Sequence, residues 1–138
     1  MPNKPSAGLG DAEAEILNIV WNKGSARVQE IWEALPPERS ITPATVQSVL
    51  RRLRAKGYVK SKLSGRAHVF SAAAQPKVVT RRLVQRFLRT LFGGDPLPLL
   101  MHLAENKDLT PDDLSKIRQV VEQAQPPGKQ DEQRRKHR

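Results

Sequence analysis

Between Ser40 and Val59 the chain combines short polar side chains with arginines on the outward side of a predicted helix. Small and amide side chains near the start of such a helix can reach base edges in the major groove, and arginines near its end can bind phosphates. Taken alone, three arginines on a helix are equally compatible with a solvated face. The pattern predicts DNA contacts by Thr42, Ala44, Thr45, Gln47, Ser48, Arg51, Arg52 and Arg54.

The same stretch carries the signals of a helix with defined ends. Thr42 is a good N-cap, and Pro43 suits the first helical position because its missing N–H costs nothing there. Gly57 ends the helix, and Lys56 is placed to face the negative end of the helix dipole. One apolar stripe at helical spacing is predicted to be buried, and it comprises Val46, Val49, Leu50 and Leu53.

Two shorter helices are predicted before this one. The first begins with Asp11 as its cap and ends at Gly24, and the second runs from about Val28 to Leu35 before two prolines. Two short helices, a turn and a third helix with arginines outside form a helix-turn-helix pattern. The side chains predicted to be buried are Ile16, Leu17, Val20 and Trp21 in the first helix and Val28, Ile31, Trp32 and Leu35 in the second.

A hairpin is predicted directly after the third helix. Alternating residues from Val59 to Ser71 surround a Ser64-Gly65-Arg66 turn, which gives the hairpin a basic tip. After a helix-turn-helix this hairpin is typical of a wing, and the side chains expected along the flanking DNA backbone are Lys60, Lys62 and Arg66. The alternative is a plain sheet edge that lysines protect against aggregation.

The chain from residue 76 onward is predicted to form three more helices, with a break at Phe92-Gly93-Gly94-Asp95-Pro96. About fifty residues rarely hold a stable core alone. We therefore expect a second copy of the chain to complete it as a homodimer, the alternative being that these helices fold back on the N-terminal domain. The residues expected at the dimer interface are Leu83, Phe87, Leu91, Leu99, Leu100, Leu103, Leu114, Ile117 and Val121.

Composition sets the class of partner. The 138 residues carry 24 basic and 14 acidic side chains, a net charge of +10 that favours a polyanion, nucleic acid before membrane. No apolar run is long enough for a transmembrane helix, and the absence of cysteine excludes disulfides and fits a cytoplasmic protein. We expect a flexible segment 1–8, a DNA-binding domain 9–75, a dimerisation region 76–125 and a disordered basic tail 126–138.

Several motifs, taken together and in order, resemble the penicillinase-repressor family of bacterial transcriptional regulators, known as BlaI, MecI and CopY. They are Leu9-Gly10, Glu13 to Trp21, Glu30-Ile31 to Leu35, Thr42-Pro43, Thr45-Val46, Arg52-Leu53, Lys56-Gly57 and Phe87 to Asp95. The resemblance covers about residues 9–124. It implies a mainly α-helical fold with a small β-hairpin wing, in which a winged helix-turn-helix precedes a helical dimerisation region. It also implies a dimeric repressor on a palindromic operator.

The resemblance further implies how repression ends. In the family, release follows cleavage in the apolar helix after the Gly-Gly break, and this depends on a membrane-bound sensor metalloprotease. By position the scissile bond would be His102–Leu103, where well-known members have asparagine and then phenylalanine. Copper sensing through the C-terminal cysteine cluster of one branch is excluded, because the chain has no cysteine.

Other function classes have less support. The chain has no Gly-rich phosphate loop and no His/Glu pair at metal spacing, so we predict no enzyme activity, cofactor or metal. His68, His102 and His137 are far apart, which favours solvated or structural roles. Two binding modules remain as alternatives: a winged helix that senses a small ligand directly, and an RNA- or protein-docking module. Few exposed aromatics are predicted for RNA stacking.

Overall fold

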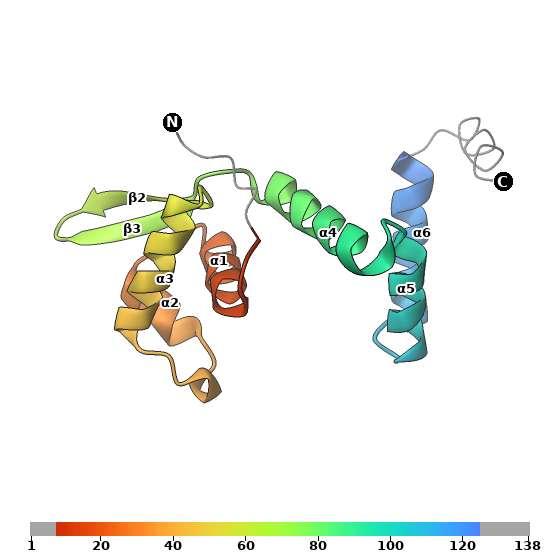
Figure 1. The fold of residues 1–138 in the computed structure, drawn as a ribbon, viewed down its shortest axis with the longest axis horizontal. Coiled ribbons are helices and arrows are strands. Elements are labelled where there is room, and N and C mark those ends of the chain that lie inside the picture. Colours follow the sequence, from red (N-terminus) through yellow and green to blue (C-terminus); the bar gives the residue numbers. More distant parts are fainter. Residues whose placement is uncertain (1–7, 125–138) are drawn as a thin grey trace. The chain divides into compact units, whose positions relative to one another are not determined.

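The computed structural model describes residues 8–124, so the predicted basic tail of residues 126–138 lies outside the described part, as does nearly all of the predicted N-terminal segment. The described chain forms two compact units, one that reaches Phe87 and one that begins at Leu88. Both are drawn in Figure 1. The division falls inside a helix, whereas we expected the boundary between residues 75 and 76.

The predicted fold class is confirmed: the chain is mainly α-helical, with one small antiparallel sheet (Figure 1). The first unit comprises α1 (Asp11–Lys23), β1 (Ser25–Ala26), α2 (Val28–Ala34), a 3-10 helix η1 (Pro37–Arg39), α3 (Pro43–Ala55), β2 (Val59–Ser64), β3 (Ala67–Ala72) and most of α4 (Pro76–Phe92). The second unit holds the end of α4, α5 (Pro96–Glu105) and α6 (Pro111–Ala124).

The sheet has the strand order β1-β3-β2, so the predicted hairpin pairs with a third strand that the sequence did not indicate. Ser25 pairs with Ser71, and Ala26 pairs with Phe70. A two-residue strand has no period of its own, and pairing with the hairpin alone defines it. The short strand ties the segment between α1 and α2 to the base of the wing.

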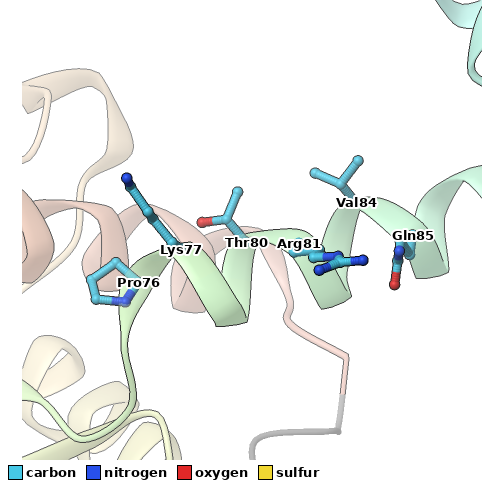
Figure 2. Close-up of a pocket in the computed structure, with 6 residues that line it drawn as sticks. All are labelled: Pro76, Lys77, Thr80, Arg81, Val84 and Gln85. Atoms are coloured by element: carbon cyan, nitrogen blue, oxygen red, sulfur yellow. The ribbon is translucent and has the colours of Figure 1, made fainter. Parts of the chain in front are cut away.

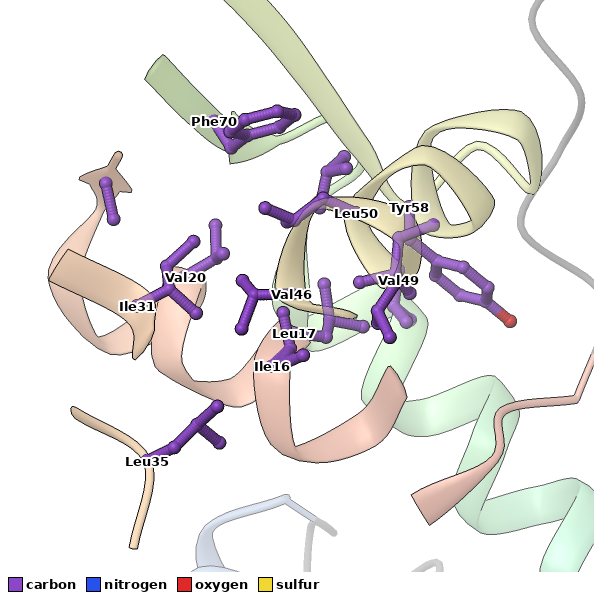
Figure 3. Close-up of a cluster of buried hydrophobic side chains, with 14 residues drawn as sticks. Ile16, Leu17, Val20, Ile31, Leu35, Val46, Val49, Leu50, Tyr58 and Phe70 are labelled. Carbon is purple, nitrogen blue, oxygen red and sulfur yellow. The ribbon is translucent and has the colours of Figure 1, made fainter. Parts of the chain in front are cut away.

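The core of the first unit lies where α1, α2, α3 and the sheet meet (Figure 3). The stripe predicted for α3 is fully buried in it. Val79 of α4 joins this core and Leu83 packs against it, which is why the compact unit extends past residue 75. The buried apolar side chains are Ile16, Leu17, Val20, Ala26, Ile31, Leu35, Val46, Val49, Leu50, Leu53, Tyr58, Val59, Phe70 and Val79.

The predicted helix ends are mostly confirmed. Thr42 caps α3, its Oγ1 accepting from the Thr45 N–H at 3.2 Å. Asp95 caps α5 in the same way, accepting from the Leu97 N–H at 3.0 Å. Thr110 accepts from the Asp113 N–H at 3.1 Å, at the start of α6. These side chains satisfy backbone donors that have no partner within the helix.

Two local predictions are wrong, and two are met only in part, because Trp21 and Val28 are half-buried against the core. Asp11 does not cap α1: the cap is Gly10, and the donor there is satisfied from inside the helix, because Glu13 Oε1 accepts from the Gly10 N–H at 3.1 Å. Trp32 is not buried in α2, since 36% of it is exposed. Its indole N–H donates to the carbonyl of Ile41.

The second unit has a different character. No described residue of α5 or α6 is buried, although both helices carry many large apolar side chains. Gly93 and Gly94, both at positive φ, provide the break between α4 and α5. The exposed large apolar side chains from residue 88 on are Leu91, Leu97, Leu100, Met101, Leu114, Val120 and Val121.

Candidate nucleic-acid interface

The outer face of α3 presents every side chain that the sequence assigned to it. Gln47 and Ser48 are exposed in the first half of the helix, and Arg51 and Arg52 are exposed further along. Thr42, Ala44 and Thr45 are also exposed at the N-terminal end. The helix contains no acidic residue, so its outer face is uniformly neutral or cationic. Such a face complements the anionic groove of a duplex.

Both ends of α3 are anchored to the rest of the first unit. At the start, Trp32 Nε1 donates to the carbonyl of Ile41 at 2.6 Å, immediately before the cap Thr42. Ser40, in the turn before it, has a left-handed backbone with φ 50°. These contacts fix the entry into α3, and therefore the direction in which its first turn points.

The C-terminal anchor is an ion pair that the sequence did not reveal. Lys56 does not stay beside its own helix end but crosses to α1, where its Nζ lies 2.7 and 3.0 Å from the Glu13 carboxylate oxygens and 3.2 Å from the Gly8 carbonyl. Burial by itself raises the pKa of Glu13, but hydrogen bonds from Lys56 and from the Gly10 N–H, with the charges of Lys56 and Arg52, outweigh it and hold that pKa below its ordinary value.

Arg54 has a partner inside the protein. Its Nη1 donates to Ser61 Oγ of β2 at 3.0 Å. This hydrogen bond joins α3, the recognition helix of the helix-turn-helix, to the wing. We predicted this arginine as a phosphate contact. A guanidinium carries five N–H donors, so one hydrogen bond to Ser61 leaves others for a phosphate. Arg54 therefore combines a structural contact with its predicted role.

The hairpin register separates the wing into two faces. Lys60 pairs with Ser71 and Lys62 pairs with Val69, and directly paired residues lie on the same face. Ser61, which accepts from Arg54, pairs with the buried Phe70 on the opposite face. The two lysines are therefore exposed on the side of the wing away from the core, while Arg66 lies exposed in the turn.

Leu63 and His68 are candidate contacts that the sequence analysis did not assign to DNA. They pair with each other next to the turn, on the same hairpin face as Ser61. Both are exposed, Leu63 to 61%. Alternation alone could not show this, because it does not say where the core ends and the projecting part of the wing begins. An apolar side chain at such a tip suits the floor of a minor groove.

The residues predicted for a dimer interface fall into three groups. Leu83 packs against the core of the first unit. Leu99, Leu103 and Ile117 are half-buried. The remaining residues are exposed, namely Phe87, Leu91, Leu100, Leu114 and Val121. Apart from Phe87, the residues of the exposed group belong to the second unit.

The predicted scissile bond lies inside α5. His102 is exposed and Leu103 is half-buried. The His102 carbonyl accepts from both the backbone N–H and the side-chain amide of Asn106, at 3.1 and 2.8 Å. A protease that cuts this bond must first unwind the last turn of α5, because an extended substrate cannot keep these hydrogen bonds.

A surface depression of about 450 Å³ lies along the first half of α4 (Figure 2). Its lining residues all come from this one helix, so polar groups do not converge on it from different elements, as they do in small-molecule sites. Among residues 8–124, no group of three or more His, Asp or Glu side chains has the arrangement of a metal site. The depression is lined by Pro76, Lys77, Thr80, Arg81, Val84 and Gln85.

The arrangement of α1, α2 and α3 with the β2–β3 wing defines a winged helix-turn-helix protein. The chain belongs to the penicillinase repressor family, whose model matches residues 9–123. None of the described helices is long and apolar enough to cross a membrane.

The chain is also similar to individual proteins. The chain is 25% identical over 121 residues to the penicillinase repressor of Staphylococcus aureus, covering 88% of this chain and 95% of that protein. It is 23% identical over 113 residues to the methicillin resistance regulatory protein MecI of Mammaliicoccus sciuri, covering 82% and 92%. Among solved structures, the DNA-binding domain of the repressor BlaI aligns with a TM-score of 0.47 and 27% identity, covering 54% of this chain and 89% of that domain.

Proposed function

We propose that this chain is a sequence-specific DNA-binding transcriptional repressor that acts as a homodimer on a palindromic operator. The observation that carries the proposal is the outer face of α3, which is free of acidic residues and presents Gln47 and Ser48 ahead of Arg51 and Arg52. In this order, base-reading side chains precede phosphate-binding ones, as docking in a major groove requires. Membership in a family of repressors supports the same function.

The wing supplies the second set of contacts. Lys60, Lys62 and Arg66 are exposed on it and would follow the backbone beside the half-site, together with the arginines of α3. With about four phosphates neutralised per subunit, a dimer would show a salt slope near −7, at about −0.9 per phosphate.

The homodimer part of the proposal is supported by the exposed apolar side chains of the second unit. Leu91, Leu100 and Leu114 are all at least one-third exposed in the single chain. Large exposed apolar side chains in such number are typical of an interaction site, and a second copy would present the same side chains to it. Two recognition helices related by a two-fold axis then match two half-sites of a palindrome.

Release by proteolysis is the last part of the proposal. A membrane-bound sensor metalloprotease would cut the His102–Leu103 bond and so remove α6 from the subunit. Co-expression with such a protease and mass spectrometry of the repressor would test it. Fragments 1–102 and 103–138 are expected, and an intact chain under inducing conditions would contradict this part alone.

The test of DNA binding is a mobility shift with the intergenic region upstream of the protein's own gene, random duplex as competitor and salt varied. Saturable binding that survives the competitor and maps to a two-fold site is expected. Binding that random duplex abolishes at every salt concentration would contradict the proposal. Direct sensing of a small ligand, or docking to another protein, would then be the better supported functions.

A further inference from the structure

A junction of charged groups lies where α1, the end of the recognition helix and α4 come together in the first unit. The ammonium of Lys56 has three oxygen partners there, two from Glu13 and one from the Gly8 carbonyl. Glu13 is 8% exposed, so this pair is shielded from water far more than an ordinary surface pair. A partly buried charge with its donors satisfied holds its surroundings in one geometry.

The fourth helix reaches the same junction. The guanidinium of Arg86 lies against Gly8, so that a β-carbon at Gly8 would come within 3.4 Å of Arg86 Cζ. The phenol of Tyr58 is buried, and this burial raises the pKa of Tyr58. The charge of Arg86 lowers the same pKa, and the charge of Glu13 raises it. Both charged groups are therefore close enough to Tyr58 to act on its phenol.

Because of the position of Lys56 in the chain, this junction connects the end of α3 to α1. Lys56 is the C-cap of α3, and Tyr58, which is 1% exposed, follows it before the wing begins at Val59. Val79 anchors the other side of the junction, since it places the first half of α4 in the same core. The recognition helix and the helix that leads to the second unit are thus held to one another through α1.

We propose that Glu13 and Lys56 are positioning residues that fix the recognition helix relative to the base of α4 and so determine the half-site spacing that the dimer accepts. This proposal rests on the proposed function, because spacing has meaning only for a dimer on a two-fold site. Neither residue needs to touch DNA. They act through the direction of α3, and loss of the pair lets that direction vary.

The experiment measures affinity for a series of operators whose half-sites are moved apart or together by one and two base pairs. Each added base pair turns one half-site by roughly a tenth of a turn relative to the other, so a rigid dimer tolerates few members of the series. The variant Glu13→Gln keeps the shape of the side chain and removes its charge. The matched control is Glu15→Gln, which removes the same charge from another residue of α1, one that pairs with Arg39 at 2.8 Å and not with Lys56.

For the wild type and Glu15→Gln we expect one preferred spacing. The penalty for a wrong spacing is the Kd at a one-base-pair shift divided by the Kd at the preferred spacing. For Glu13→Gln this ratio should fall by at least about threefold, the scale of one weakened charged hydrogen bond. A general loss of stability would instead weaken binding at all spacings alike. Equal spacing profiles for Glu13→Gln and Glu15→Gln would overturn the proposal.

A second pair of variants tests the other partner and does not depend on Glu13→Gln folding well. Lys56→Met removes the ammonium and should broaden the spacing profile, whereas Lys56→Arg retains a charged donor and should restore most of the preference. A wild-type profile for Lys56→Met would also overturn the proposal. A wild type that shows no spacing preference at all would instead contradict the proposed dimer on a palindrome, so the two failures are distinguishable.

Discussion

The two compact units both contain amphipathic helices, but they differ in how many apolar side chains these helices bury. All fourteen buried apolar side chains of the described chain lie between Ile16 and Val79, in the first unit. In α5, leucine or methionine occupies half of the ten positions, yet no side chain is buried. Apolar content therefore does not decide burial here. A sheet and three helices enclose the first core, whereas the described residues of α5 and α6 bury no side chain among themselves.

This difference separates two kinds of stability. The first unit is stabilised by its own core and should fold as a single chain. If the proposed dimer covers its exposed apolar side chains, the stability of the second unit should depend on concentration. The predictions below test that contrast, beginning with the largest expected effect.

Truncating a core leucine should affect the first unit strongly. Leu50→Ala removes a fully buried side chain of α3, and a loss of about 2–5 kcal/mol in the free energy of unfolding is expected from lost burial and the cavity left behind. Urea unfolding followed by far-UV circular dichroism measures it. An unchanged midpoint would show that the core does not stabilise this unit.

A charge on the surface of the second unit should act on assembly instead. Leu91 is 65% exposed in the single chain, so Leu91→Glu should leave the first unit folded but weaken the dimer. If Leu91 is covered on dimerisation, loss of about 1.5–3 kcal/mol raises the dimer Kd by roughly 10- to 150-fold. Sedimentation at several concentrations gives the constant. The control is Val78→Glu, at an exposed apolar position of the first unit outside the predicted interface.

Substitutions on α3 should alter DNA binding without changing either unit. Gln47→Ala should cost about 1–3 kcal/mol on the operator and little on random DNA, because a glutamine can bond an adenine edge twice. Arg52→Ala should weaken both DNAs alike and make the salt slope shallower by about one. Fluorescence anisotropy with operator and random duplexes separates the two. Equal losses on both duplexes for Gln47→Ala would remove its role in reading bases.

Acid should loosen the first unit through Glu13. Its pKa is lowered in the folded chain, so the stability it contributes is present above its ordinary pKa and is lost as pH falls through the lower, folded value. The wild type should therefore exceed Glu13→Gln in stability near neutral pH, and the difference should vanish in acid. Unfolding midpoints of both proteins from neutral to acid pH measure it. A constant difference would contradict a charged role for this side chain.

The sequence was sufficient for most of the structure that depends on neighbours in the chain, with the cap of α1 as an exception. The cap at Thr42, the stop at Gly57 and the apolar stripe of α3 are local, and all three are confirmed. The hairpin is local as well. Its third strand, Ser25–Ala26, is not, because it exists only through pairing with residues more than forty positions away.

The parts of the site that escaped prediction are long-range pairs of polar groups. Lys56 and Glu13 are 43 positions apart, and a lysine at a helix end has an adequate local explanation in the helix dipole. Arg54 was assigned to phosphate because nothing in the sequence shows that Ser61 will face it. Long side chains can satisfy several partners, so spacing alone does not select one.

The positions of the two tryptophans have a practical consequence. The chain has two tryptophans, and Trp21 and Trp32 both belong to the first unit. Tryptophan emission therefore reports on the DNA-binding unit alone, whereas helical ellipticity sums over both. On dilution below the dimer constant, ellipticity should fall while emission stays constant. One natural chromophore pair thus separates loss of assembly from loss of fold without any label.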